Sequence, residues 1–204
     1  MNFKTEQESF WEGKFGNDYI KRNNEERIVE SNINFFNLSL KKADDIRTCI
    51  EYGANIGLNL KALKTILPHL KIKGIEINKK ACEILAKEIG DENVVCESIL
   101  DYKFEQKFDL VLIKTVLIHI NPKYLKNVYK SLYNSSKKYI LICEYYNDKP
   151  IKLNYRGNQD RLFKRDFAGE MIEKYNLKLI DYGFIYRRDK LFNTDDRNWF
   201  LLEK

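Results

Sequence analysis

The sequence lacks the features of several protein classes. No apolar run approaches the roughly 20 residues of a membrane span, and the first six residues (MNFKTE) contain no apolar stretch of a signal peptide. The chain has two histidines, His69 and His119, and this scarcity argues against a zinc or iron site. We therefore expect a cytoplasmic protein without a bound metal.

Cysteine pairs with the CxxC spacing of metal or redox motifs are also absent. The four cysteines are widely spaced, and we expect them to be buried free thiols: Cys49, Cys82, Cys96 and Cys143. Linkers, repeats and low-complexity segments are missing as well. We therefore expect one domain over residues 1–204, with a helical cap at 1–45, a core at 46–204 and a substrate lid at 146–166.

The net charge of +6 and the pI of about 8.9 raise the question of a nucleic-acid partner. However, the lysines are scattered among nearly as many acidic residues, and no basic block interleaved with aromatics stands out. Most of the charge is expected to be solvated surface, and the remainder favours an anionic small-molecule substrate. Neither a nucleic-acid nor a membrane partner is expected.

A glycine-containing turn follows a short apolar run at residues 49–60 (CIEYGANIGLNL). The order Glu51, Gly53, Asn55, Gly57 differs from the dinucleotide-binding pattern G-x-G-x-x-G, which has no acid at the strand end. Such a turn lets a polar ligand approach the backbone and the N-terminus of the next helix. Asn55 suits this turn because asparagine tolerates positive φ. An ordinary strand–helix connection is the alternative interpretation.

Three later strand ends carry polar residues at regular intervals. Glu76 ends an apolar run 19 residues after Gly57, the spacing at which an acid on the neighbouring parallel strand accepts ribose hydroxyls. Residues 93–101 (NVVCESILD) form another such run. Residues 107–122 (KFDLVLIKTVLIHINP) form the next, ending at Lys114 and Thr115 with His119 shortly after.

These motifs resemble those of class I S-adenosylmethionine-dependent methyltransferases. The segment 51–57 resembles their motif I with asparagine in place of the middle glycine, and 108–122 resembles the fourth-strand motif of small-molecule methyltransferases. The resemblance implies S-adenosylmethionine as cofactor and S-adenosylhomocysteine as product. It implies roles for an acid near the methionine amino group, a ribose clamp and adenine contacts, and it implies a contact of Tyr19 and Arg22 with the methionine carboxylate. The expected cofactor-binding residues are Tyr19, Arg22, Glu51, Gly53, Asn55, Gly57, Glu76, Ile77, Ser98, Ile99, Lys114 and Thr115.

The secondary-structure pattern is that of an α/β protein. A helical segment is expected at 3–37, followed by alternating strands and helices, which predict a parallel sheet covered on both faces. The expected helices are 58–67, 79–89, 124–134 and 167–175, and the expected strands are 72–77, 94–97, 110–114, 139–144, 177–187 and 199–203, after the strand that precedes Gly53. The last two strands have no helix between them and predict an antiparallel pair. The resemblance implies a Rossmann-like, seven-stranded sheet in the order 3-2-1-4-5-7-6.

A narrower resemblance covers almost the whole chain. Residues 10–19 (FWEGKFGNDY), 52–60, 155–157 (YRG), 162–170 (LFKRDFAGE) and 195–204 (DDRNWFLLEK) together resemble the pseudaminic acid biosynthesis-associated methylases. This resemblance implies a link to nonulosonic-acid pathways, which make carboxylated sugars for surface glycans. It implies a small acidic sugar or nucleotide-sugar as the acceptor.

A basic segment after the fifth strand is placed to bind such an acceptor, because the connections at the carboxyl ends of the strands hold ligands. Its expected substrate-binding residues are Tyr155, Arg156, Arg161, Lys164 and Arg165, since arginine suits a carboxylate or phosphate. A charged helix start with Asp166 as N-cap is the alternative for some of these residues.

His119 is the expected catalytic base, because a sugar hydroxyl must lose its proton and histidine is matched to that task near pH 7. A packing role beneath the cofactor or a hydrogen bond to a loop carbonyl oxygen is the alternative, and an amine acceptor would need no strong base. Two rival functions remain open at this stage. One is a methyltransferase acting on RNA or protein, and the other is a non-catalytic S-adenosylmethionine-binding protein.

Overall fold

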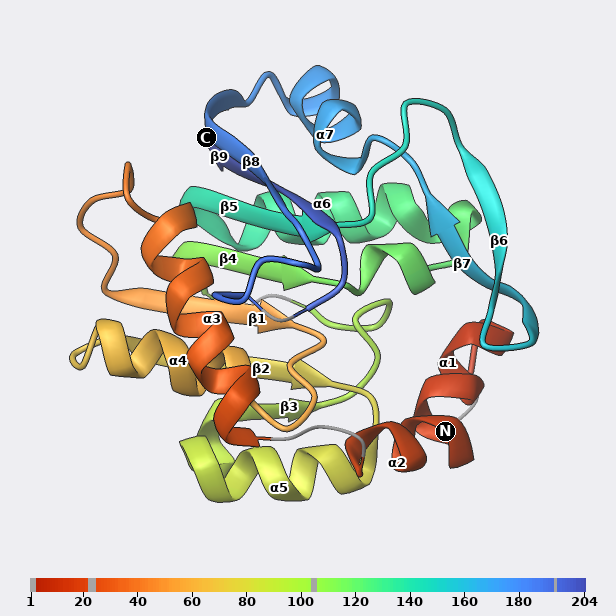
Figure 1. Cartoon of the computed structure of the whole chain (residues 1–204). Helices are drawn as coiled ribbons and strands as arrows, with labels where there is room; N and C mark the ends of the chain where they lie inside the picture. The colour runs from red at the N-terminus through yellow and green to blue at the C-terminus, as the bar shows by residue number, and fades with distance from the viewer. Residues whose placement is uncertain (1–2, 22–24, 104–105, 193) are drawn as a thin grey trace.

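A seven-stranded sheet lies at the centre of the computed structural model, which describes residues 3–21, 25–103, 106–192 and 194–204 (Figure 1). Its order is β3-β2-β1-β4-β5-β9-β8, with β1 to β5 parallel and β9 antiparallel to both β5 and β8. The strands are β1 (Thr48–Tyr52), β2 (Lys71–Glu76), β3 (Val94–Cys96), β4 (Phe108–Lys114), β5 (Ser136–Glu144), β8 (Lys178–Ile185) and β9 (Arg197–Glu203). Because β8 and β9 are the sixth and seventh strands of this sheet, the predicted order is confirmed.

Helices cover both faces of the sheet, as the alternating pattern predicts. One face packs against α3 (Glu25–Ser39), α4 (Leu58–Ile66) and α5 (Lys79–Ile89), and the other against α6 (Leu125–Ser135) and α7 (Phe167–Tyr175). Successive residues of the central strands alternate between the two cores, with Leu110 and Leu112 facing α3 and α4 while Val111 faces α6. All three are fully buried, as expected for a parallel strand covered on both sides.

The N-terminal segment, predicted as one helical stretch, forms three helices in the described residues. They are α1 (Glu6–Glu12), α2 (Lys14–Ile20) and α3. A capping box between Thr5 and Glu8 starts α1, and Gly13 separates α1 from α2 in extended backbone. Helices α1 and α2 lie at the carboxyl end of the parallel strands (Figure 1), whereas α3 packs along the face of the sheet and reaches that end with Ile28, Ser31 and Asn32.

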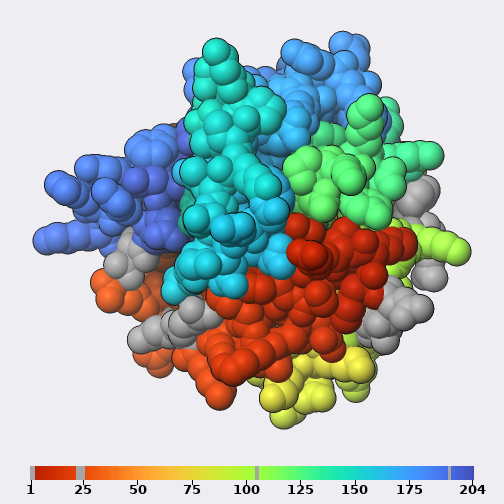
Figure 2. Space-filling model, turned by 90° about the vertical axis from the view of Figure 1, so that its right-hand side faces the viewer, coloured from red at the N-terminus to blue at the C-terminus, as the bar shows by residue number. Residues whose placement is uncertain are grey.

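The predicted lid segment contains a β-hairpin that the sequence pattern did not indicate. Strands β6 (Ile151–Tyr155) and β7 (Asn158–Lys164) pair around Arg156 and Gly157, whose φ values of 49° and 81° suit a tight hairpin turn. The hairpin lies beside α1 and α2 (Figure 2), on the side of the molecule to which the parallel strands point (Figure 1). The contacts that join them include a hydrogen bond from Gln7 Nε2 to the Asp160 carbonyl oxygen at 2.8 Å and an ion pair between Arg161 and Glu6 at 3.2 Å.

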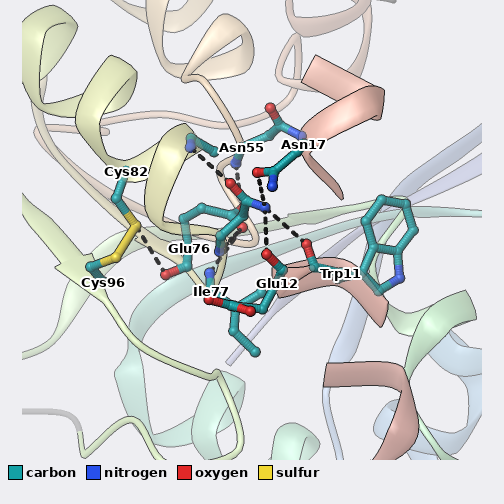
Figure 3. Close-up of a disulfide and its surroundings, with 10 residues drawn as sticks. Trp11, Glu12, Asn17, Asn55, Glu76, Ile77, Cys82 and Cys96 are labelled. Atoms are coloured by element: carbon teal, nitrogen blue, oxygen red, sulfur yellow. Dashed lines mark hydrogen bonds between the residues drawn. A yellow bond between two sulfur atoms is a disulfide. The ribbon is translucent and has the colours of Figure 1, made fainter. Parts of the chain in front are cut away.

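The prediction of four free thiols was wrong for two of the cysteines. Cys82 and Cys96 form a disulfide, whereas Cys49 and Cys143 are free and buried. The pair comes together because Cys82 lies in the first turns of α5, and Cys96 lies in β3 directly beside Glu76 of β2 (Figure 3). This proximity depends on how α5 packs against the sheet, which the spacing of the cysteines does not reveal.

Reduction of this disulfide should lower the free energy of unfolding by about 3 kcal/mol, the value expected for a closed loop of this length. The two cysteines are 14 residues apart in the sequence. Chemical unfolding with and without reductant measures the effect, and Cys96→Ser should unfold like the reduced wild type. Coincident midpoints for the oxidised and reduced protein would show that the cross-link contributes no stability.

The described residues also form three short 3-10 helices: η1 (Asp91–Asn93), η2 (Leu117–His119) and η3 (Pro122–Tyr124). Within the described ranges, none of the helices combines the length and hydrophobicity that a membrane crossing requires.

Candidate functional site

A cavity of about 620 Å³ lies at the carboxyl ends of β1, β2 and β4, where α1, α2 and the β6–β7 hairpin contribute to its walls. Parallel sheets bind their ligands at this edge, and the volume falls within the usual range for small-molecule sites. Twelve of the residues expected from the sequence line it. They are Tyr19, Gly53, Asn55, Glu76, Ile77, Ser98, Ile99, Lys114, Thr115, His119, Tyr155 and Arg156.

The turn after β1 brings backbone to the cavity floor. Gly53, Asn55 and Gly57 all have positive φ, at 76°, 49° and 87°. A side chain at Gly53 would place its Cβ 2.5 Å from Val116, so glycine is required there by both space and conformation. Asn55 adopts the left-handed conformation that its side chain tolerates. Gly57 is the N-cap of α4 and does not line the cavity.

Glu76 is held at the cavity wall by three backbone N–H groups (Figure 3). The N–H of Asn55 donates to its Oε2 at 2.8 Å, and the N–H groups of Ile77 and Asn78 donate to Oε1 at 2.9 and 2.7 Å. Burial raises the pKa of this carboxyl, while the three donors lower it. A carboxylate has about four acceptor positions, so one remains to face a ligand.

The side of the cavity next to Glu76 is bounded by β3 and α1. Ser98 and Ile99 follow β3 and line the wall, and the Ser98 hydroxyl donates to the carboxylate of Glu8. Asn78 contacts the same N-terminal segment, since its side-chain amide donates to the carbonyl oxygens of Trp11 and Glu12 at 3.1 and 3.0 Å (Figure 3). These hydrogen bonds hold α1 against this end of the cavity.

Glu51 does not line the cavity but belongs to a buried polar network beside it. Asn59 Nδ2 donates to Glu51 Oε1 at 2.5 Å, and Lys114 Nζ donates to Asn59 Oδ1 at 3.0 Å and to Asn32 Oδ1 at 2.8 Å. Burial raises the pKa of the Glu51 carboxyl. Burial, followed by the nearby charge of Arg197, lowers the pKa of Lys114.

His119 lies in η2 with its ring at the cavity wall and only 7% of its surface exposed. Nδ1 lies 2.6 Å from the carbonyl oxygen of Arg161. Because a carbonyl oxygen only accepts, Nδ1 carries the hydrogen of the neutral ring, and Nε2 keeps a lone pair. Burial lowers the pKa of His119 to about 4, so the ring is neutral near pH 7. The rings of Trp11 and Tyr155 pack against it, with centroids 4.7 and 4.8 Å away.

The structure brings only part of the expected basic segment to the cavity. Tyr155 and Arg156 line it, whereas Arg161, Lys164 and Arg165 do not. Arg161 pairs with Glu6, Lys164 lies 5.2 Å from the centre of the Tyr145 ring, and Arg165 pairs with Glu170 at 2.5 Å. Asp166 is the N-cap of α7, as the alternative interpretation of this segment predicted. Arg22 lies outside the described residues.

The connection between β8 and β9 supplies cavity residues that sequence reasoning did not single out. These residues are Arg187, Thr194, Asp195 and Arg197, and Tyr145 lines the cavity beside them. Tyr145 donates its hydroxyl hydrogen to Asp195 Oδ2 at 2.8 Å. The available signal was the polar run at 194–198 between two apolar strands, which ends at the same sheet edge as the glycine turn.

The two ends of the cavity offer different chemistry. Near β2 and β3, a carboxylate with a free acceptor position lies beside the apolar side chains of Ile77 and Ile99, which suits a ribose and a flat base. Near β4, β5 and β9, positive side chains accompany a neutral histidine with an unprotonated Nε2. The residues present therefore fit a nucleoside ligand at one end and an anionic group at the other. In the described part of the chain, no cluster of three metal-ligating side chains occurs.

Part of the chain matches a known family. A family model described as a methyltransferase domain matches residues 50–138, from β1 to the start of β5. None of the curated proteins matches the sequence.

Solved structures share the fold across nearly the whole chain at low sequence identity. A methyltransferase from Leishmania major is 15% identical with a TM-score of 0.69, and the match covers 98% of this chain and 87% of that one. The 1,6-didemethyltoxoflavin-N1-methyltransferase of Burkholderia thailandensis is 12% identical with a TM-score of 0.68, covering 93% and 82%. The magnesium protoporphyrin IX methyltransferase of Synechocystis PCC 6803, solved with bound S-adenosylmethionine, is 10% identical with a TM-score of 0.65, covering 100% of both chains.

Proposed function

We propose that this protein, an S-adenosylmethionine-dependent methyltransferase by its methyltransferase domain and its class I fold, methylates a small acidic sugar or nucleotide-sugar of a nonulosonic (pseudaminic) acid pathway. The observation that carries the acidic acceptor is the pair of arginines, Arg156 and Arg187, that lines the same cavity as His119. Arginine binds carboxylates and phosphates in bidentate geometry, so this end of the cavity favours an anion.

The different chemistry of the two cavity ends supports one orientation of the bound cofactor. Glu76 would accept a ribose hydroxyl, Ile77 and Ile99 would enclose the base, and the turn at Gly53 would lie beneath the tail. When bound, S-adenosylmethionine supplies an electrophilic methyl group on its sulfonium. The protein's own contribution is to hold the acceptor in line with that group under the cover of α1, α2 and the hairpin, where water is excluded.

His119 would remove the acceptor's proton. Its Nδ1–H is anchored on the Arg161 carbonyl oxygen, so the basic Nε2 is the nitrogen left for an acceptor hydroxyl. Trp11 and Tyr155 pack against the ring and restrict its orientation. The acceptor hydroxyl would lie between His119 and the arginines that bind its acidic group.

Methyl transfer from cofactor labelled at the methyl group tests the proposal. Purified protein is incubated with an acidic nonulosonic sugar, its nucleotide-activated form, a neutral hexose, total RNA and a peptide mixture, and the products are analysed by mass spectrometry. Label in the acidic sugars alone is the expected result. Label in RNA or peptides would establish the rival transferase function. Cofactor binding by calorimetry without any turnover would indicate a non-catalytic binding protein.

Arg156→Gln should raise the KM for the acidic acceptor about tenfold and leave the KM for S-adenosylmethionine unchanged, because Arg156 lines the cavity and is expected to contact only the acceptor. Lys152→Gln is the matched control on the same hairpin, since its exposed ammonium pairs with Asp160 on the hairpin and does not line the cavity. Equal increases in both KM values for Arg156→Gln would point to a distorted hairpin instead of lost recognition.

A further inference from the structure

Two cations, Lys114 and Arg197, line the cavity without an acidic partner in the described part of the chain. Among the described residues, Lys114 Nζ bonds only to the neutral amide oxygens of Asn32 and Asn59, and it lies 5.6 Å from the centre of the Phe35 ring. The Arg197 guanidinium contacts the Thr194 hydroxyl and the Cys143 thiol. Its Nε is buried and lacks a hydrogen-bond partner among the described residues.

Such an arrangement is costly unless a negative charge completes it. A buried cation loses its hydration, and two neighbouring cations also repel each other. Burial and then the charge of Arg197 lower the pKa of Lys114, because both disfavour its protonated form. Neutral partners such as Asn32 and Asn59 satisfy hydrogen bonds but do not compensate charge.

The nearest carboxyl groups are engaged elsewhere. Glu51 is bonded by Asn59, and Oε1 of Glu144 accepts the backbone N–H groups of Val116 and Leu117 at 2.9 and 2.8 Å. Burial raises the pKa of Glu144 to about 8, while its backbone donors and then Arg197 lower it, and neither carboxyl group forms an ion pair with Lys114 or Arg197 in the described part of the chain. The charge of Lys114 and Arg197 is therefore left for a ligand.

The position of the two cations indicates which part of a ligand would reach them. Lys114 ends β4, Asn59 lies in the first turn of α4, and Arg197 begins β9 two strands away. Glu76 ends β2 on the other side of β1. A ligand with its sugar at Glu76 that crosses the glycine turn therefore has its far end at Lys114 and Arg197.

We propose that Lys114 and Arg197 form a subsite for a carboxylate, with Asn32 and Asn59 holding the lysine in place. The inference rests on the proposed function and deepens it, because it adds a carboxylate contact at β4 and β9 to the arginines of the hairpin and the β8–β9 connection. The carboxylate has two sources, the methionine tail of the cofactor and the acid group of the acceptor. The location beside the first turn of α4 favours the cofactor tail, for which the sequence motifs implied Tyr19 and Arg22.

Calorimetry with two cofactors separates the sources without requiring the acceptor. S-adenosylmethionine and decarboxylated S-adenosylmethionine differ only in the carboxylate, and wild type should bind the former about tenfold more tightly. Arg197→Gln should abolish this preference by weakening only the carboxylated cofactor. Lys114→Met should act in the same direction and provides a second variant if Arg197→Gln fails to fold. Arg188→Gln, at an exposed residue next to a cavity arginine, should change neither affinity.

The remaining outcomes are decisive as well. If Arg197→Gln leaves both cofactor affinities unchanged but raises the KM of an acidic acceptor, the subsite stands and its carboxylate belongs to the acceptor. An equal loss for both cofactors, or no change in any of these quantities, overturns the subsite. A wild-type protein that binds neither cofactor would refute the proposed function itself, which this design distinguishes from failure of the subsite.

Discussion

Replacing Glu76 by glutamine should weaken S-adenosylmethionine binding by about 3 kcal/mol, roughly 150-fold in Kd. The carboxylate accepts three backbone N–H groups and has one acceptor position left for a ribose hydroxyl. A hydrogen bond to an ionised group contributes about 1.5 to 3 kcal/mol. Glutamine removes that charge. Its N–H₂ group would also face backbone N–H donors, so a hydrogen bond that now holds the turn at Asn55 would be lost.

Calorimetric titration with S-adenosylhomocysteine measures this effect without any acceptor. Glu83→Gln is the matched control, because Glu83 is an exposed residue of α5, the helix that follows Glu76. Thermal unfolding of both variants separates lost affinity from lost fold. An unchanged Kd for Glu76→Gln would remove Glu76 from the ribose contact and would place the nucleoside elsewhere in the cavity.

The sheet order could be predicted because each parallel strand and its following helix form a local unit with clear ends. Helices α5 and α7 begin and end where the sequence indicated, since Asn78 and Asp166 cap their first turns with side-chain hydrogen bonds. The β6–β7 hairpin was not predictable in the same way. Strand β6 alternates apolar and polar residues over only five largely exposed positions, and β7 is polar up to Leu162, so neither carries the apolar run that marks the strands of the central sheet.

The site residues were predictable where one motif brings them together and not where distant segments meet. Asn55 and Glu76 lie at adjacent strand ends, and the spacing of motif residues reports that directly. Arg197 meets Lys114 only through the antiparallel return of β9, 83 positions later in the sequence. Likewise, the basic run at 161–165 looked like one cluster, but its side chains pair with Glu6 and Glu170 outside the cavity.

His119→Asn should lower kcat about 10²-fold or more while leaving the Kd of S-adenosylmethionine unchanged. The asparagine amide can still donate to the Arg161 carbonyl oxygen, as Nδ1 does in the wild type, but it has no basic nitrogen in place of Nε2. The substitution therefore separates the two roles of His119. The variant lacks the base, but its amide still holds the hairpin through the Arg161 carbonyl oxygen. Near-wild-type turnover would assign His119 to packing beneath Trp11 and Tyr155.

The pH profile provides an independent check on the same residue. Because burial holds the pKa of His119 near 4, the base is unprotonated above about pH 5, and kcat/KM should be independent of this group from there to pH 8. The rate should fall only as the pH decreases through about 4, when a proton binds Nε2. A histidine with its ordinary pKa of about 6.5 would instead lose activity below neutrality. His69→Asn, at the other histidine and exposed to solvent, should leave both kcat and the profile unchanged. A profile that falls with a midpoint near 6.5 would show that the reacting imidazole is exposed to water during turnover, which is incompatible with a base enclosed by α1 and the hairpin.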